Sequence, residues 1–379
     1  GGTNGDILVK ASGDISLTAD ESITTSGGDV TLWSDSDGNG TGYVLLEGGA
    51  NNGIFSGGGD IFLGGGADVS TGFARGAAIL KNSFSVAGVH LGDQATLNSS
   101  GGNITLRGEN YGQNYNSVQP GITLYNSILD AGIGKILLYG VAGGSGNANA
   151  QGITLFGSNS VRSANADADA IEFIGDASST DNSATSLGIN FAGVIEATGG
   201  GGIIMSGKAN TAANYDQAFD INGSILADSG TVTLIAENDG STETGLYFGS
   251  GAHLGFKSAT NVIASTSDIV IKSDNTVFNN SNSVSFNTSG AISLLPLDAS
   301  ASFGVDQVIS NLVLDAGVSA LTIGKSTNTA DVTIDSPLSV VGPIILYGGD
   351  ITISESLNTI SGGTNGDILV KASGDISLT

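Results

Sequence analysis

The sequence predicts an all-β protein that folds as a parallel β-helix, a solenoid with about three short strands per coil and roughly 12 coils per 361-residue unit. Three observations lead to this prediction. Similar segments recur about every 30 residues, apolar and polar residues alternate inside them, and Gly, Asn, Asp and Ser interrupt each run. A period of this length is typical of solenoids, in which each repeat buries its apolar side only against its neighbours.

The longest repeat involves the two ends of the sequence. Residues 1–18 read GGTNGDILVKASGDISLT, and residues 362–379 have the same eighteen letters at an offset of 361 residues (362 − 1). We therefore divide the chain into one full unit, 1–361, and the start of the next identical unit, 362–379. The simplest interpretation is an interior piece of a much longer protein with such units in tandem. The alternative is a single duplication at the two ends.

A shorter repeat lies inside this unit. Segments with apolar residues at similar places begin at Gly88, Gly121, Gly188 and Phe219, and the second of them reads GITLYNSILDAGIGKILLYG. Looser copies begin at residues 42, 152 and 245. Each segment predicts one coil that lies flat on its predecessor.

The strands of each coil are predicted by alternation with a period of two. In 104–106, 122–124 and 232–234, two apolar residues flank a threonine, which is the pattern of a strand with one face inward. Ile, Val and Thr also favour strands, and no ten-residue stretch has helical periodicity. Stacked coils about 4.8 Å apart would make each unit a rod of about 60 Å.

The turns between strands account for the high glycine content. The chain has 61 Gly, and glycine bends sharply without a steric penalty at its Cβ position. A flexible linker is excluded because the apolar alternation persists between the glycines. Tandem immunoglobulin-like sandwiches would need a period near 100 residues, which the sequence does not have.

Composition excludes several classes of protein. The chain has 36 acidic and 11 basic residues, a formal charge of −25, no Cys and two His. Eleven scattered cations cannot supply the basic face that nucleic acids require, so we expect no nucleic-acid partner. A disulfide scaffold or thiolate metal site is impossible. The mean hydropathy of +0.18 argues against disorder, and no apolar run approaches the ~20 residues of a membrane span.

Four phrases in the sequence resemble the coils of the filamentous-haemagglutinin-like exoproteins of bacterial two-partner secretion and related giant surface adhesins. They are GDISLTADESI (13–23), SGGDVTLWS (26–34), SGGNITLRG (100–108) and GGDITISES (348–356). The resemblance implies a right-handed β-helix, export to the bacterial cell surface and a role in adhesion or biofilm matrix. The amino-terminal secretion domain of that family and an RGD tripeptide are not among these 379 residues.

Long polar loops are candidate contact sites. Segments 107–120, 141–151, 207–218 and 236–244 are rich in Asn, Gly and Ser, and stacking would place them along one side of the rod. The expected alternatives are solvated corners that tolerate insertion and a polar ridge for glycans or lateral copies of the rod. The candidate contact residues in this ridge are Tyr111, Tyr115, Tyr215, Glu237 and Asp239.

One acidic turn is a candidate calcium site. Asp35, Asp37 and Asn39 stand at positions 1, 3 and 5 of a calcium-loop pattern, with Gly40 at position 6. Position 12 is Leu46 instead of an acid, and Asp and Asn also form turns without a metal. We therefore expect no required cofactor, with Ca²⁺ as the one candidate ion.

The alternative function is that of a carbohydrate-active β-helix, such as a polysaccharide lyase or a phage tailspike. It would need paired carboxylates or calcium with a basic proton acceptor. The candidate cluster comprises Asp167, Asp169, Glu172 and Asp176, with Arg162 nearby. Glu172 lies between Ile171 and Phe173, so we expect it to face solvent.

The two histidines and the glycosylation motifs add no site. His90 lies between two apolar residues and is predicted to point outward, and His253 lies in another coil. Asn98, Asn103, Asn222 and Asn287 begin N-x-S/T sequences, which we expect to be unmodified.

These observations together predict a structural and adhesive extracellular fibre rather than an enzyme. Its partners would be neighbouring repeat units end to end, with no membrane insertion in this segment.

Overall fold

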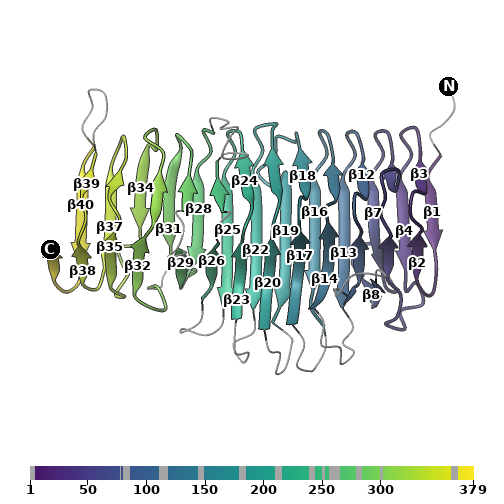
Figure 1. The fold of residues 1–379 in the computed structure, drawn as a ribbon, viewed down its shortest axis with the longest axis horizontal. Helices are drawn as coiled ribbons and strands as arrows, with labels where there is room; N and C mark the ends of the chain where they lie inside the picture. The colour runs from purple at the N-terminus through teal and green to yellow at the C-terminus, as the bar shows by residue number, and fades with distance from the viewer. Residues whose placement is uncertain are drawn as a thin grey trace.

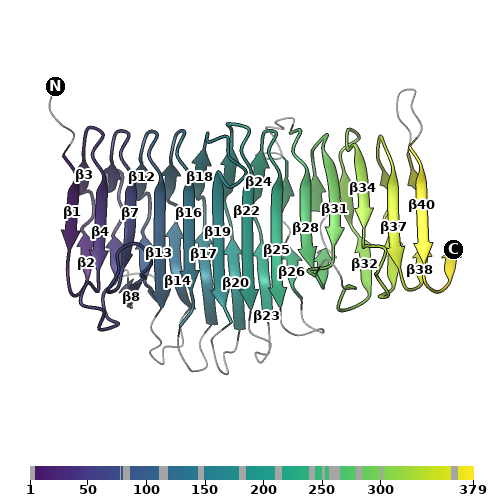
Figure 2. The ribbon, with the colours of Figure 1, turned by 180° about the vertical axis from the view of Figure 1, so that it is seen from behind.

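The computed structural model describes residues 5–76, 78–79, 86–110, 118–143, 149–178, 185–209, 216–238, 244–249, 252–255, 265–278, 284–298, 302–359 and 366–379. These residues form 41 β-strands and include no helix that could span a membrane. The strands wind into a parallel β-helix with the two chain ends at opposite ends of the stack (Figures 1 and 2). The predicted all-β solenoid is confirmed.

Sheet A runs along the whole stack, and each coil begins with one of its strands. Its thirteen ordered strands are β1 (Ile7–Lys10), β4 (Val30–Ser34), β7 (Ile61–Gly65), β13 (Ile104–Asn110), β16 (Ile136–Val141), β19 (Ile171–Ala177), β22 (Ile203–Ala209), β25 (Val232–Asn238), β28 (Ile269–Ser273), β31 (Ala291–Leu295), β34 (Ala320–Ile323), β37 (Ile344–Gly348) and β40 (Ile368–Ala372), and β8 (Ala74–Gly76) also pairs with β13.

Sheet B supplies the second strand of the first nine coils, and sheet C supplies the third strand of the first ten. Sheet B contains β2 (Ile15–Leu17), β5 (Val44–Leu46), β11 (Val89–Leu91), β14 (Val118–Tyr125), β17 (Asn149–Phe156), β20 (Thr185–Phe191), β23 (Asp216–Ile221), β26 (Leu246–Phe248) and β29 (Thr276–Phe278). Sheet C contains β3 (Ser22–Thr24), β6 (Gly53–Phe55), β12 (Thr96–Asn98), β15 (Ile128–Asp130), β18 (Ser160–Ser163), β21 (Val194–Ala197), β24 (Ser224–Ala227), β27 (His253–Leu254), β30 (Val284–Phe286) and β33 (Leu312–Leu314).

Two shorter sheets continue these positions to the C-terminal end. Sheet D contains β32 (Gln307–Ser310), β35 (Val332–Asp335), β38 (Ile351–Ile353) and β41 (Ile376–Leu378), and sheet E contains β36 (Leu338–Ser339) and β39 (Leu357–Asn358). Between β29 and β32 the ladder is interrupted, and the Gln307 side chain bridges the gap: its Oε1 accepts the Thr276 N–H at 3.2 Å and its Nε2 donates to the Asp274 carbonyl at 3.1 Å. The remaining described pair, β9 (Ala78–Ile79) with β10 (Val86–Ala87), is antiparallel.

The register in sheet A gives the length of each coil. The shortest steps are 23 residues, as from Ile7 to Val30 and from Ile269 to Ile292, and the longest is 43, from Ile61 to Ile104. Twelve such steps lead from Ile7 to Ile368, a distance of 361 residues (368 − 7). The predicted three strands per coil and twelve coils per unit are therefore confirmed, and the long repeat contains a whole number of coils.

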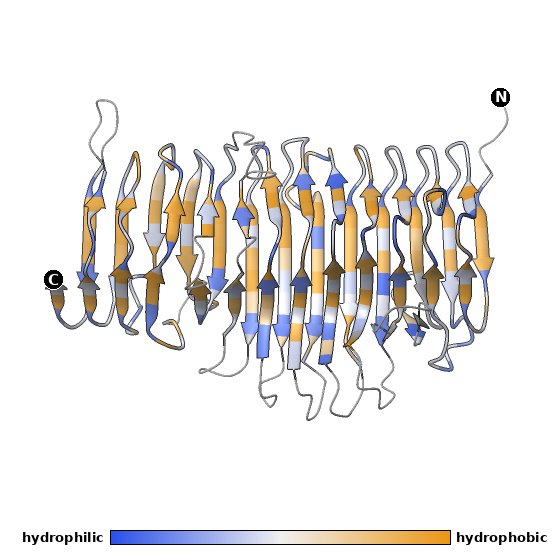
Figure 3. Ribbon diagram, viewed as in Figure 1, coloured by the Kyte–Doolittle hydropathy of each residue, from blue (hydrophilic) through white to orange (hydrophobic). Residues whose placement is uncertain are grey.

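Alternate side chains of each strand build one apolar core. In sheet A, one fully buried column contains Val30, Ile104, Ile136 and Ile203. The next residue along each of these strands faces outward. Figure 3 shows the resulting mixture of apolar and polar bands along the strands. Six phenylalanines are among the largest buried side chains: Phe173, Phe191, Phe219, Phe248, Phe278 and Phe286.

The turns carry ladders of acidic and amide side chains. Before successive strands of sheet A, the carboxylate of Asp6 accepts the Asp29 N–H, that of Asp29 accepts the Asp60 N–H, and that of Asp60 accepts the Asn103 N–H, at 2.7–3.0 Å. Asp306, Asp331, Asp350 and Asp375 repeat this contact before the strands of sheet D. Many acidic residues therefore pair with the backbone of the next coil, where the main-chain N–H needs an acceptor.

Candidate functional site

Five successive coils carry an extension at the corner between sheets A and B. There the strands run past the core: β13, β16, β19, β22 and β25 continue outward, and the chain returns in β14, β17, β20, β23 and β26. Figure 1 shows this extension below the middle of the stack. Ala142, Ala150 and Ala177 form a small separate core inside it.

A narrow waist separates the extension from the main core. Gly108, Gly140, Gly175 and Gly207 are in register in sheet A, and Gly121, Gly152 and Gly188 lie opposite them in sheet B. A Cβ atom on Gly140 would collide with the carbonyl oxygen of Gly152, and one on Gly175 with that of Gly188. The two sheets can approach this closely only because these positions lack side chains.

The predicted polar ridge corresponds to this extension. Segments 107–120, 141–151, 207–218 and 236–244 all leave sheet A at the same corner, although their ends belong to strands rather than loops. The end of β19 and the start of β20 lie at the same corner, and the sequence between them was not selected, although its run of Ser, Thr, Asp and Asn resembles the other polar segments. The binding role of the ridge stays a prediction.

Of the predicted contact residues, Tyr111, Tyr115, Tyr215 and Asp239 lie outside the described residues. Glu237 lies near the end of β25, half-buried, and its register neighbour is Lys208 of β22.

The candidate calcium loop follows β4. Asp35 is buried, and its Oδ1 accepts the N–H groups of Gly40 at 3.0 Å and Thr41 at 3.3 Å. Asn39 donates from Nδ2 to Asp37 at 2.9 Å and accepts the Thr41 N–H at 2.9 Å. The three predicted ligands therefore lie in one turn and close it with their own hydrogen bonds. Within the described ranges, no three His, Cys, Asp or Glu residues gather as a metal site.

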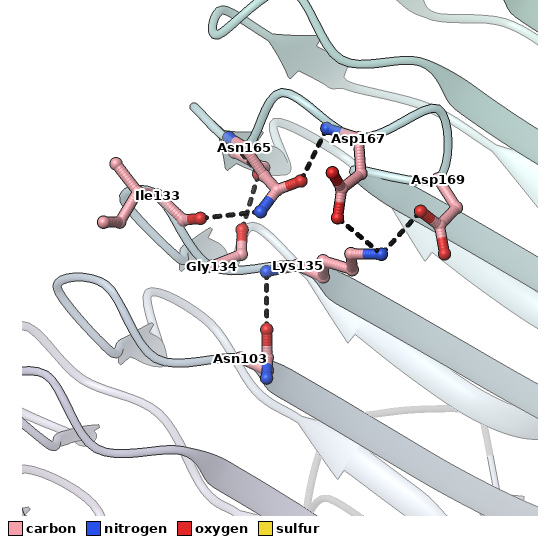
Figure 4. A network of polar contacts seen from close by, with 8 residues as sticks. Asn103, Ile133, Gly134, Lys135, Asn165, Asp167 and Asp169 are labelled. Atoms are coloured by element: carbon pink, nitrogen blue, oxygen red, sulfur yellow. Dashed lines mark hydrogen bonds and ion pairs between the residues drawn. The ribbon is translucent and has the colours of Figure 1, made fainter.

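The acidic cluster contains a two-sided ion pair (Figure 4). Lys135 Nζ lies 2.9 Å from Asp167 and 2.6 Å from Asp169 in the next coil. The ammonium lowers the pKa of Asp169, and the two carboxylates raise the pKa of Lys135. Asn165 fixes the turn by donating to the Ile133 carbonyl at 2.8 Å and accepting the Asp167 N–H at 2.8 Å. The arrangement joins neighbouring coils.

The other members of the predicted cluster lie apart. Glu172 faces outward from β19 as expected, where burial and then Asp169 raise its pKa. Asp176 lies farther along β19, in the extension, and Arg162 lies in sheet C, 3.7 Å from Glu196. The structure therefore does not bring these groups together as an acid–base pair.

His90 lies on the outward side of β11, between the core residues Val89 and Leu91, but it does not face solvent. Its side chain is fully buried, in register with Leu45 and Thr123 in sheet B, which are also buried. The outward face of sheet B in these coils is covered as well as the inward face, so alternation along one strand does not reveal burial. His253 lies in β27, half-buried, and burial lowers its pKa.

The outer face of sheet A combines aromatic and basic side chains that the sequence analysis did not select. The Lys10 ammonium lies 3.8 Å from the centre of the Trp33 ring. Farther along, Arg107 lies 6.0 Å from the Tyr139 ring, which Phe73 contacts edge-on at 4.9 Å. The alternation in the sequence could have placed Lys10, Trp33, Arg107 and Tyr139 on one outer face, because each of them lies between two inward-facing residues.

The strands of sheet A hold more basic than acidic residues, unlike the chain as a whole. They hold six basic residues and four acidic residues, in a chain with 11 basic and 36 acidic ones. The basic residues are Lys10, Arg75, Arg107, Lys208, Lys272 and Lys371, and the acidic ones are Glu109, Glu172, Asp176 and Glu237.

Comparisons of the chain with protein-family models, curated proteins and solved structures find no match, so functional inference rests on the fold and surfaces described above.

Proposed function

We propose that this chain is a rod-like structural and adhesive segment of an extracellular fibre on a bacterial surface or in a biofilm matrix. The observation that carries the proposal is the ladder of sheet A, which reaches Ile368 after twelve whole coils and there restarts the sequence that begins the stack. A unit that ends in the register in which it began can be followed by another unit without a break. The coil motifs that resemble filamentous-haemagglutinin-like adhesins support the same role.

The rod derives its stiffness from contacts that repeat in every coil. Backbone hydrogen bonds run parallel to the axis, the apolar columns stack below them, and the turn carboxylates join one coil to the next. Stretching or bending the rod would break many of these contacts together. The chain needs no reaction for this role, and no enzymatic activity is proposed.

The outer face of sheet A is the proposed adhesive surface. Aromatic rings offer flat stacking surfaces, and the neighbouring Lys10 and Arg107 attract anionic groups. Its local excess of basic groups suits acidic glycans or the acidic sides of neighbouring rods. Divalent cations, including Ca²⁺, would bridge acidic surfaces that otherwise repel each other.

Electron microscopy of a chain extended to two complete units tests the rod. We expect an unbranched, straight particle lengthened by about 60 Å per unit. Particles that bend at a fixed joint between units would contradict the proposal. Incubation with acidic polysaccharides is the second arm, because depolymerisation by the purified chain would favour the carbohydrate-active alternative.

A further inference from the structure

Four aromatic side chains gather on the outer face of sheet A, over strands β4 to β16 (Figure 1). Trp33, Phe62 and Tyr139 come from β4, β7 and β16, and Phe73 lies just before β8. The Phe62 ring covers Gly64, because a Cβ atom on Gly64 would lie 2.5 Å from Phe62 Cζ. Gly64 is the register neighbour of Trp33, so the Phe62 ring fills the place beside Trp33 in the outward column. These four half-buried rings form an aromatic platform.

The segment 66–73 holds the aromatic platform in place from outside. The Trp33 indole N–H donates to the Gly66 carbonyl at 2.6 Å, and Arg107 Nη1 donates to the Thr71 carbonyl at 3.4 Å. The same segment ends in one of the four rings, which meets a second ring edge-on at 4.9 Å. One segment therefore fixes side chains from three coils, which lowers the ordering cost that a ligand would meet.

Two cations lie beside the platform. Lys10 Nζ lies 3.8 Å from the centre of the Trp33 ring, and Arg107 lies 6.0 Å from a second ring. Within the described residues neither cation forms an ion pair, whereas three others do: Arg75, Lys135 and Arg162. The single acidic residue in strands β1, β4, β7, β13 and β16 is Glu109, which is paired with Arg75 at 2.7 Å. Both cations are therefore available to an external anion.

We propose that the aromatic platform and its two cations bind a linear anionic polysaccharide, a polymer of sugars that carry carboxylate or sulfate groups. The apolar C–H face of a sugar ring stacks on an aromatic ring, and its anionic group pairs with a cation beside that ring. The five strands from β1 to β16 span about 19 Å along the stack, so the site suits a polymer rather than a single sugar. This inference rests on the proposed adhesive role of sheet A and names the class of its ligand.

The same observations argue against two other anionic partners. A DNA duplex carries one phosphate charge per ~1.7 Å, which two cations do not match. The acidic side of a second rod would pair with the cations but would leave the rings without a stacking partner. A sugar polymer with spaced charges uses the rings and the cations together.

Affinity electrophoresis of the 379-residue chain tests the site with four polymers. We expect polygalacturonate, which carries carboxylates, or dextran sulfate to retard the chain, and the stronger of the two identifies the anionic group. Neutral dextran and polyglutamate, which has carboxylates but no sugar rings, should not retard it. Three results would overturn the proposal: no retardation by either anionic polysaccharide, equal retardation by polyglutamate, or equal retardation by dextran.

Two double variants separate the contributions of the rings and the cations. We expect Trp33→Ala/Tyr139→Ala and Lys10→Gln/Arg107→Gln each to weaken binding by at least about tenfold, because each removes one half of the recognition. Circular dichroism checks that both variants keep their β structure. If the first does not, the second still decides, because the Lys10 side chain is exposed and its replacement leaves the rings in place.

The matched control is Lys272→Gln/Tyr347→Ala, which removes one cation and one ring from the same outer face but outside the platform. It should leave the affinity within about twofold of the unaltered chain. An equal loss in the control would attribute binding to sheet A as a whole and overturn the platform.

The failure of this site is distinguishable from the failure of the fibre function. A two-unit chain that forms a straight rod in the electron microscope, while no anionic polysaccharide retards the 379-residue chain, would reject the platform and leave the fibre proposal standing.

Discussion

Carboxylates in this acidic chain occupy two different environments. Asp29 and Asp60 lie in exposed turns, where each accepts a backbone N–H from the next coil. Asp220 instead lies on the outward side of β23, between Asn190 and Tyr247, and burial raises its pKa despite a 2.6 Å hydrogen bond from Asn222. The first group joins one coil to the next by hydrogen bonds, whereas the charge of Asp220 opposes folding.

The raised pKa of Asp220 predicts a pH dependence. Above the ordinary Asp pKa, the unfolded chain loses a proton that the folded chain still holds, so stability falls as pH rises through the raised value. We expect Asp220→Asn to raise Tm at pH 7 by roughly 1–3 °C and to have little effect at pH 3. Thermal unfolding at both pH values measures this effect.

The control is Asp335→Asn, which removes the same formal charge from an exposed position. Equal gains in the two variants at pH 7 would attribute the effect to net charge and contradict the role of burial.

Among the elements, the glycine waist decides how sheets A and B meet. Without side chains at Gly140, Gly175 and Gly207, the two backbones contact each other, and the strands can continue into the extension. The waist therefore closes the main core and lets the strands continue into the extension outside it.

Gly175→Ala should lower the free energy of unfolding by about 1–3 kcal/mol, as overpacking does in close-packed interiors. The added methyl would meet the carbonyl oxygen of Gly188, which belongs to a strand fixed on both sides. Urea denaturation measures the change. Gly13→Ala is the matched control because its Cβ would have open space, and a similar loss there would contradict the argument.

The interruption between β29 of sheet B and β32 of sheet D can also be tested by a single substitution. Gln307→Leu would leave the Thr276 N–H and the Asp274 carbonyl without their buried partner, which costs about 1–3 kcal/mol. We expect faster hydrogen exchange in β29 and β32, measured by mass spectrometry. Strands β13 and β16 serve as the internal control, and uniform acceleration along the stack would contradict a local effect.

On the scale of the whole molecule, charge governs how rods approach. The net charge of −25 repels parallel copies, while the outer face of sheet A holds more basic than acidic residues. Contacts between rods should therefore depend strongly on ions, because exposed charges are screened within about 10 Å at 0.1 M salt.

A chelator should disperse bundles that form in the presence of calcium while the β-sheet circular dichroism of each rod stays unchanged. Divalent ions would bridge acidic surfaces between rods, whereas the turn carboxylates inside a rod already pair with backbone N–H groups. Light scattering follows the bundles, with NaCl of matched ionic strength as the control. Bundles that persist in chelator would refute ion bridging.

The solenoid, its three strands per coil and its twelve coils per unit could be predicted from the sequence, because period-two alternation and internal repeats are local signals. The same repeats predicted that the polar segments leave the stack along one side, because each segment occupies the same place in its coil.

Pairings between coils needed the tertiary structure. Coils range from 23 to 43 residues, so no fixed spacing reveals that Lys135 meets Asp167 and Asp169, or that Arg162 lies near Glu196. The burial of His90 likewise depends on what covers the outer face of sheet B. Strand positions are set by neighbours along the chain, whereas charge pairs and burial are set by residues that only the winding of the coils brings together.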